Sequence, residues 1–337
     1  MAIKKNILAI LFFFISSMVF AQSDSVRTYI DSALIVLREN SLYANNVNWK
    51  KVEKQIYKQA SEVKSKAKAF EVLKIAFTAL GDKHANYFSP EGNSYRLDNS
   101  ELMSRYTDSL KAGWKRGLRI ENKMIGDIAY ISIPTIGVGK QQDIDKYANW
   151  IYDAVNSLSA KNPKGWIIDL RMNGGGNIRP MLAGLAMFFD NGTYTYYIDK
   201  DGNATDKAGF LNGDFVIDDQ PQATIKTKMN LLSDARVALL IGPGTASSGE
   251  GVALVFSQKN NVKSFGTNTA GLANSTNGFV FYNKEFYFLI SVAKIANKDK
   301  KLYSEIVKPQ VYVKGYENFY KLADDPSVIE AIKWLKK

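Results

Sequence analysis

The hydrophobic pattern changes its period along the chain, and this change limits the folds available to it. In the first quarter of the chain, apolar residues recur at the spacing of amphipathic helices, as Val26, Ile30, Ala33 and Leu37 do. After a polar stretch at 89–115, the pattern becomes short β-rich runs that alternate with helical ones. This alternation is typical of α/β layering. The sequence therefore predicts a small helical subdomain followed by a larger α/β domain.

The larger domain is expected to alternate strands with helices. The predicted strands are 128–133, 166–170, 237–241, 264–266, 278–281, 286–291 and 310–313, and the predicted helices are 142–159, 178–189, 247–258 and 327–336. Between His84 and a first strand near Leu118, the chain is too short for an extra module of ordinary size. We therefore expect no inserted peptide-binding (PDZ) domain.

The first residues predict export. Lys4 and Lys5 precede an apolar run at 7–20 that is followed by the small residue Ala21, as in a secretory signal peptide. The run is shorter than the roughly 20 apolar residues that a membrane-spanning helix needs, which favours cleavage after Ala21 over an uncleaved anchor. The expected divisions are then a signal peptide at 1–21, a helical subdomain at 22–90 and the α/β domain at 91–337. We expect a periplasmic or secreted protein with no integral membrane segment.

Composition narrows the chemistry further. The sequence has no cysteine, which excludes disulfides, catalysis by a thiol, thiolate metal sites and a lipid anchor on an N-terminal cysteine. The formal net charge is +11, but the lysines are spread along the chain, without an arginine-rich run or a nucleic-acid-binding motif. We expect a solvated cationic surface and no nucleic-acid partner, with weak attraction to an anionic envelope surface left open.

A turn of small residues at 242–247 separates a buried apolar run from a predicted helix. Ser247 stands at the helix start, where nearby backbone N–H groups and the helix dipole favour developing negative charge. The alternative is that Ser247 only caps the helix, with Glu250 completing a capping box three residues later. The segment is not the Gly-x-Ser-x-Gly elbow, because Thr245 occupies the position of the first glycine.

A second glycine-rich turn follows the predicted strand 166–170 and contains Gly174, Gly175 and Gly176. Successive glycines leave backbone N–H groups unshielded, so the turn can donate to a phosphate or to an oxyanion, or can simply connect a strand to a helix. Neither nucleotide-binding fingerprint is present, since Arg179 occupies the final glycine position of Gly-x-Gly-x-x-Gly.

His84 is the only histidine of the chain. It cannot form a zinc site with other histidines or with cysteines. A lone histidine is more often structural than catalytic, but imidazole is the side chain whose ordinary pKa suits proton transfer near neutral pH. Any base that activates a serine here would most simply be His84.

Taken together, these segments resemble the tail-specific protease family of serine peptidases, over most of the mature chain. Residues 169–176 are similar to the family's Asp-Leu-Arg-x-Asn-x-Gly-Gly segment, and residues 247–250 are similar to its Ser-x-x-Glu motif. One branch of the family carries a lysine base downstream of the serine, and the matching position here is Leu272. An apolar side chain cannot accept a proton, so the chain departs from that branch.

Residues 80–84 instead resemble the Leu-Gly-Asp-x-His motif of a second branch, which includes the tricorn core and the interphotoreceptor retinoid-binding repeats. In that branch a distant glutamate completes the site, and the segment 303–309 looks like the one that carries it, which makes Glu305 the corresponding acid. The alternative for Glu305 is an exposed side chain in a lysine-rich loop. Lys83 is a departure, because tricorn-like sites can place a serine before the histidine.

The resemblance implies a crotonase-like α/β core and a serine endopeptidase of the cell envelope. It implies Ser247 as nucleophile, His84 as general base and Glu305 as orienting acid, with the backbone N–H groups of Gly175 and Ser248 as the oxyanion hole. Neither a metal nor an organic cofactor is required, and the substrate would be a peptide or protein. The alternatives are a non-catalytic protein that binds peptides or lipophiles on the same scaffold, and an esterase or amidase.

Overall fold

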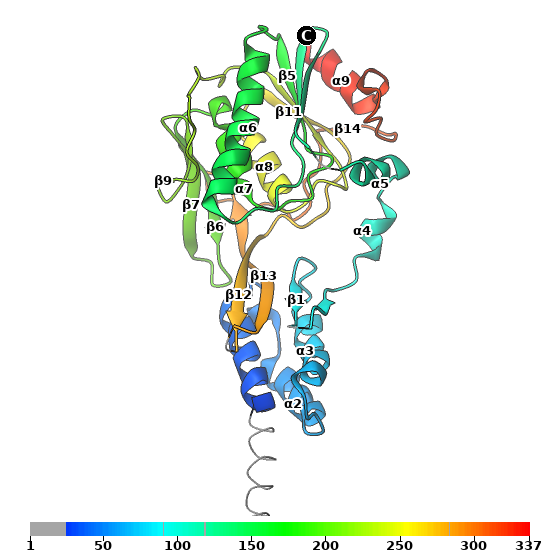
Figure 1. The fold of residues 1–337 in the computed structure, drawn as a ribbon, viewed down its shortest axis with the longest axis vertical. Coiled ribbons are helices and arrows are strands. Elements are labelled where there is room, and N and C mark those ends of the chain that lie inside the picture. Colours follow the sequence, from blue (N-terminus) through cyan, green and yellow to red (C-terminus); the bar gives the residue numbers. More distant parts are fainter. Residues whose placement is uncertain (1–24, 90, 118, 283) are drawn as a thin grey trace, which may run out of the picture. The chain divides into compact units, whose positions relative to one another are not determined.

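The computed structural model describes residues 25–89, 91–117, 119–282 and 284–337. The predicted signal peptide at 1–21 and its cleavage site therefore lie outside the described residues. The chain divides into two compact units (Figure 1): unit 1 is Met1–Asp98 with Thr276–Ala293, and unit 2 is Asn99–Ser275 with Lys294–Lys337. The domain boundaries 22–90 and 91–337 stay a prediction. In the division into compact units, the later segment Thr276–Ala293 belongs to unit 1 as well.

Unit 1 contains the helices that the apolar spacing predicts. They are a helix at residues 25–40, α2 (Trp49–Ala60) and α3 (Lys66–Leu80). The Asn48 side chain accepts a hydrogen bond from Lys51 N–H at the start of α2, and Gly81, with a φ of 69°, ends α3. The apolar faces of these helices pack around a core that includes Leu37, Leu73 and Phe77.

Short antiparallel strands complete unit 1. β2 (Ser94–Tyr95) pairs with β1 (Asn86–Phe88), β1 pairs with β13 (Phe286–Ala296), and β13 also pairs with β12 (Ser275–Phe281). Aromatic side chains from this sheet enter the helical core, where the ring of Tyr87 stacks on Phe70 at 4.1 Å between centroids. The turn after α3 is therefore fixed between a helix and a sheet.

The centre of unit 2 is a six-stranded sheet of order β14-β11-β10-β5-β4-β3. Its strands are β3 (Glu121–Ile125), β4 (Ile128–Ser132), β5 (Gly165–Asp169), β10 (Val237–Ile241), β11 (Val262–Gly266) and β14 (Val311–Tyr312). All neighbouring pairs are parallel except β3 with β4. β4, β5 and β10 are buried throughout, as expected for parallel strands that are covered on both faces.

Because successive side chains of a strand point to opposite faces of the sheet, neighbouring residues of this sheet belong to two separate cores. Leu239 of β10 packs on one face with α6 (Gln141–Ser159), α7 (Ile178–Gly184) and α8 (Ser248–Phe256). Leu240, the next residue, packs on the other face with α9 (Pro326–Leu335), which Figure 1 shows apart from α6 and α7. The layered α/β fold predicted from the sequence is confirmed.

Several elements of unit 2 were not predicted. A second antiparallel sheet contains β6 (Gly192–Ile198), β7 (Ala204–Leu211), β8 (Asp214–Ile217) and β9 (Gln220–Pro221), with the end of β13 paired to β6. The polar stretch after residue 98 forms α4 (Ser100–Ser104) and α5 (Asp108–Lys115). The helix predicted at 178–189 is shorter, because α7 ends at Gly184 and a 3-10 turn, Ala186–Phe188, follows.

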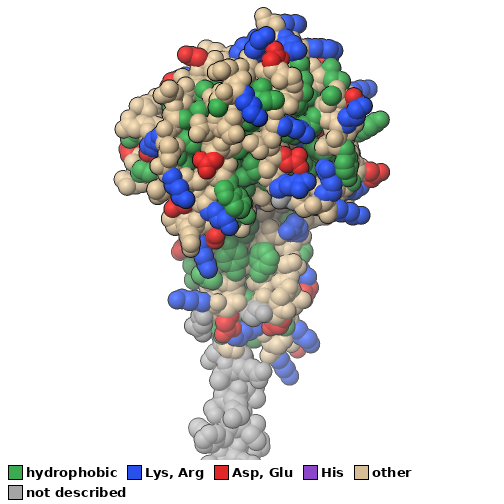
Figure 2. Space-filling view, turned by 45° about the horizontal axis from the view of Figure 1, so that its top comes forward, with side chains coloured by type: hydrophobic (Ala, Val, Ile, Leu, Met, Phe, Trp, Pro, Cys, Tyr) green, Lys and Arg blue, Asp and Glu red, His purple; other side chains and the backbone are tan. Residues whose placement is uncertain are grey.

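Within the described part of the chain, no helix has the length and apolar character that crossing a membrane requires. Lysine and arginine side chains are scattered over the face shown in Figure 2, among acidic, polar and apolar groups. On this face the positive charge is not gathered into one stripe.

Candidate active site

Ser247 is held in a strained backbone conformation between a buried strand and a helix. β10 ends at Ile241, a buried turn follows, and Ser247 caps the N-terminus of α8. Its φ of 53° and ψ of −119° lie outside the regions that residues with side chains prefer. Such strain costs on the order of 1–3 kcal/mol and persists only where surrounding contacts enforce it. The serine itself is partly exposed, while both flanking elements are buried.

The two glycine-rich turns predicted from the sequence lie together. Ala246 N–H donates to Asn173 O at 2.9 Å, and Ser248 Oγ donates to Gly176 O at 2.8 Å. Gly175, with a φ of 101°, is so close that a β-carbon there would lie 3.2 Å from Ser247 Oγ. Only glycine allows this approach, because both the conformation and the space exclude a side chain.

The predicted oxyanion donors lie beside Ser247, but one of them already donates a hydrogen bond within the protein. Gly175 N–H donates to Oδ1 of the fully buried Asn173 at 3.0 Å. A substrate oxyanion at this amide would compete with the amide oxygen of Asn173. Ser248 is the first residue of α8, where backbone N–H groups point out of the helix end.

Glu250 makes contacts that the sequence did not predict, because the capping box and the Ser-x-x-Glu motif gave it no role beyond its own helix start. Its carboxylate is fully buried and accepts hydrogen bonds from Ser247 N–H (2.8 Å), Gly271 N–H (2.8 Å), Leu272 N–H (2.9 Å) and the Thr269 hydroxyl. Burial raises the pKa of Glu250 to about 7, although these four donors act in the opposite direction. The Ser-x-x-Glu spacing was its only signal in the sequence.

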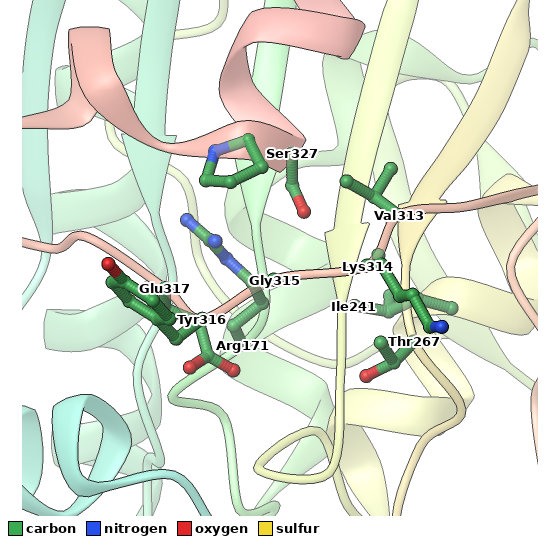
Figure 3. Close-up of a pocket in the computed structure, with 11 residues that line it drawn as sticks. Arg171, Ile241, Thr267, Val313, Lys314, Gly315, Tyr316, Glu317 and Ser327 are labelled. Carbon is green, nitrogen blue, oxygen red and sulfur yellow. The ribbon is translucent and has the colours of Figure 1, made fainter.

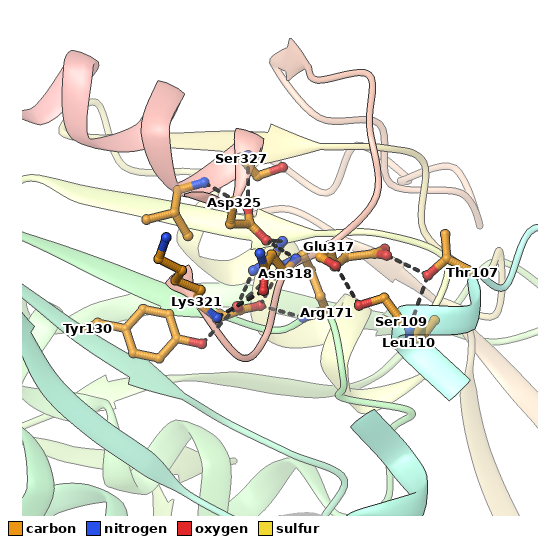
Figure 4. A network of polar contacts seen from close by, with 12 residues as sticks. Thr107, Ser109, Leu110, Tyr130, Arg171, Glu317, Asn318, Lys321, Asp325 and Ser327 are labelled. Carbon is orange, nitrogen blue, oxygen red and sulfur yellow. Dashed lines mark hydrogen bonds and ion pairs between the residues drawn. The ribbon is translucent and has the colours of Figure 1, made fainter. Parts of the chain in front are cut away.

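The Asp-Leu-Arg segment before the glycine turn has a structural task. Arg171, which Figure 4 shows beside Asp325, lies between two carboxylates: Nη2 is 2.7 Å from Asp169 and Nη1 is 2.7 Å from Asp325. Asp325 also caps α9 by accepting a hydrogen bond from Ser327 N–H, and the Tyr130 hydroxyl donates a hydrogen bond to Asp169. This buried network joins β4, the end of β5 and α9, so it fixes the base of the turn that contains Gly175.

A small pocket lies at the carboxyl ends of β10 and β11, where Figure 3 shows Arg171, Thr267, Lys314 and Glu317 among its lining residues. The Arg171 guanidinium is already paired with two aspartates. Among the described residues, no group of three histidine, cysteine, aspartate or glutamate side chains could hold a metal ion.

Glu305 lies in unit 2, beside the backbone at Gly271 and Leu272 whose amides donate to Glu250. It is exposed, its carboxylate accepts from Asn274 Nδ2 at 3.0 Å, and its backbone carbonyl accepts from Ala273 N–H at 3.3 Å. Its role as orienting acid stays a prediction.

His84 lies in unit 1, on the turn after α3. Its main-chain N–H donates to the carboxylate of the buried Asp82, which also accepts from the main-chain N–H and the hydroxyl of Ser291 on β13. The Gly-Asp-x-His segment is therefore anchored to its own sheet. The pairing of His84 with Ser247 joins residues of two different units and stays a prediction.

A strained serine at the head of a buried helix, closely approached by a glycine turn, is the arrangement of a serine hydrolase, and comparison with known proteins specifies a serine peptidase. The model of Peptidase family S41 matches residues 127–313, more than half of the chain. The chain therefore belongs to peptidase family S41.

Similar proteins cover nearly the whole chain. The nisin-resistance protein of Lactococcus lactis subsp. lactis is 26% identical over 313 residues, which are 93% of this chain and 87% of that protein. A lipoprotein from Streptococcus agalactiae has a TM-score of 0.65 at 23% identity, over 94% of this chain and 96% of that one.

Two further structures share the fold. A putative peptidase from Parabacteroides merdae has a TM-score of 0.61 at 18% identity, over 93% and 97% of the two chains. The photosystem II D1 C-terminal processing protease has a TM-score of 0.56 at 13% identity, over 86% and 93%.

Proposed function

We propose that the protein is an exported serine endopeptidase in which Ser247 is the nucleophile and His84 the general base. The observation that carries the proposal is the strained φ of Ser247 beside Gly175. A serine that only caps a helix needs neither the positive φ nor a glycine so close that a β-carbon on it would lie 3.2 Å from the serine Oγ. Leu272 stands at the position of the family's lysine, which leaves the single histidine as the side chain suited to the task.

The reaction would proceed by acyl transfer. His84 takes the proton from Ser247 Oγ as this oxygen bonds to the peptide carbonyl carbon, and returns it to the leaving amine as the C–N bond breaks. Water then hydrolyses the acyl-enzyme by the same proton transfers. The N–H groups of Gly175 and Ser248 would stabilise the oxyanion, by on the order of 3 kcal/mol per donor in comparable sites. Glu305 would orient the imidazole and stabilise its charged form.

Peptides that reach the cell envelope are the proposed substrates. One relative is named for resistance to nisin and another is described as a lipoprotein. Both names fit an exported protein, and the first makes nisin a sensible test substrate. We place the protein in the periplasm or outside the cell.

The proposal is tested by cleavage of nisin and of a mixed peptide library by the purified protein, with products identified by mass spectrometry. Ser247→Ala and His84→Ala, made separately, should each lose activity by about 100-fold or more, as expected when a nucleophile or base is removed. Ser257→Ala, at the other end of α8, is the matched control and should cleave like the wild type. Wild-type cleavage by either Ser247→Ala or His84→Ala would refute the assignment.

A further inference from the structure

Arg105 makes contacts that the proposed mechanism does not use. It directly follows α4 and its side chain is partly buried. Nη1 donates to the main-chain carbonyls of Thr269 (3.0 Å) and Asn268 (3.3 Å), and Nη2 donates to that of Ala270 (3.1 Å). Among the ion pairs of the described residues, none includes Arg105. The partly buried Arg105 guanidinium has lost some of its hydration and has no carboxylate partner in the described part of the chain. Its hydrogen bonds to these three consecutive carbonyls therefore offset most of the cost of its desolvation.

The same segment, residues 268–272, is held from its amide side by the buried carboxylate of Glu250. Gly271 N–H, Leu272 N–H and the Thr269 hydroxyl all donate to Glu250. The carbonyls thus face the positive guanidinium, and the amides face a carboxylate that is negative above its pKa of about 7. This is the favourable orientation for the peptide dipoles between the two groups. Arg105 and Glu250 therefore restrain one piece of backbone from its two hydrogen-bonding sides.

This segment is in turn connected to the nucleophile. Glu250 accepts from Ser247 N–H, and Ala270 N–H donates to Thr245 O at 2.9 Å. Thr245 is thus bonded to the 268–272 segment directly, and the amide of Ser247 is connected to the segment through Glu250. Because Ser247 has a strained φ, its conformation depends on such restraints.

We propose that Arg105 is a positioning residue for Ser247, acting through the 268–272 segment and Glu250. It does not touch the reacting atoms; it keeps the segment in the one arrangement that lets Glu250 hold the serine amide. The inference rests on Ser247 being the nucleophile. It assigns a role in activity to the stretch after residue 98, which no motif marks.

The test compares wild type with Arg105→Ala in two measurements: the rate at which a fluorophosphonate probe acylates Ser247, and the steady-state constants for peptide cleavage. A displaced nucleophile should lower the acylation rate and kcat by about 10- to 100-fold while KM changes little, since small misplacements have costs of this size. Millimolar guanidinium, which can occupy the vacated site, should restore part of the rate. The same concentration of sodium chloride should not.

Arg116→Ala is the matched control. Arg116 is exposed after α5 and stacks on Tyr320, without a hydrogen bond to the 268–272 segment. This variant should react at the wild-type rate, with no response to guanidinium. A lower melting temperature for Arg105→Ala with unchanged acylation and kcat would show a merely structural role and overturn the proposal.

If Arg105→Ala does not fold, Arg105→Lys is measured in its place. A lysine ammonium cannot reproduce the planar fork that reaches three carbonyls. Arg105→Lys should therefore be acylated more slowly than the wild type and should show faster hydrogen exchange at the Gly271 and Leu272 amides. Wild-type values for both measurements would overturn the proposal. Failure of the wild type to be labelled at Ser247 would refute the proposed function, and this inference with it. Equal labelling of wild type and Arg105 variants would refute the inference alone.

Discussion

Gly175 lies against Ser247 so closely that a β-carbon at position 175 would be 2.7 Å from Ser247 Cβ. The two residues come from turns that are more than 70 positions apart in the chain. Each turn follows a buried parallel strand, and β5 and β10 are direct neighbours in the sheet. The register of these strands therefore sets the distance between the glycine turn and the serine.

Gly175→Ala should nearly abolish acylation of Ser247 by a fluorophosphonate probe. The added methyl group would displace the serine side chain, and a φ of 101° is strained for alanine. We expect a rate at least about 100-fold lower and a loss of roughly 1–3 kcal/mol in the free energy of unfolding. Gly139→Ala is the control, because a β-carbon there meets nothing within 4 Å. Wild-type acylation by Gly175→Ala would contradict the close approach.

The pKa of Glu250, raised to about 7 by burial, should make folding stability depend on pH. Between its ordinary value near 4.5 and about 7, the folded state holds a proton that the unfolded state has lost. The stabilising contribution is thus complete below pH 4.5 and disappears as pH rises through 7. Denaturant titrations of the wild type and Glu250→Gln should show the wild type losing about 3 kcal/mol more across this window. Parallel curves for the two proteins would contradict the raised pKa.

Arg171→Met should strongly destabilise unit 2. The variant leaves the buried carboxylates of Asp169 and Asp325 without their shared cation, which costs about 3–5 kcal/mol in comparable buried pairs. Lys333→Met, which removes an exposed pair with Glu330, should change the free energy of unfolding by less than about 1 kcal/mol. Urea denaturation measures both. A small effect of Arg171→Met would mean that the network in Figure 4 does not fix the turn.

Glu305→Gln tests the orienting acid. The glutamine keeps an oxygen that can accept from Asn274 Nδ2, so the local fold should persist while the negative charge is lost. If Glu305 stabilises a charged His84, kcat for peptide cleavage should fall by about 10-fold or more with little change in KM. Glu330→Gln on α9 controls for the loss of one exposed carboxylate. An unchanged kcat would favour the alternative of a glutamate that is simply exposed.

The sequence was sufficient to predict the layered core and the turns of the site. Strands such as Val237–Ile241 are continuous apolar runs, and the turns that contain Gly175 and Ser247 follow β5 and β10. Parallel neighbouring strands then bring their carboxyl ends to one edge of the sheet. Local pattern thus predicted the strand, turn and helix start around Gly175 and Ser247, while the catalytic roles of these residues came from the family resemblance and stay a prediction.

The rest depended on contacts between distant residues. Glu250 looked like a capping residue, because its bonds to Gly271 and Leu272 cross about 20 positions of sequence. Arg105 lies between the short helices α4 and α5, which have too few turns to show a clear apolar period. Strand β6 consists mainly of threonine and tyrosine at partly exposed positions, and β7 begins with exposed residues, which weakens the strand signal of both.

Activation of Ser247 by His84 is measured by the rate of fluorophosphonate acylation in wild type and His84→Ala, with the modified residue identified by mass spectrometry. We expect the wild type to be modified at Ser247 and His84→Ala to react at least about 100-fold more slowly at pH 8. Modification at another serine, or equal rates for the two proteins, would contradict this expectation.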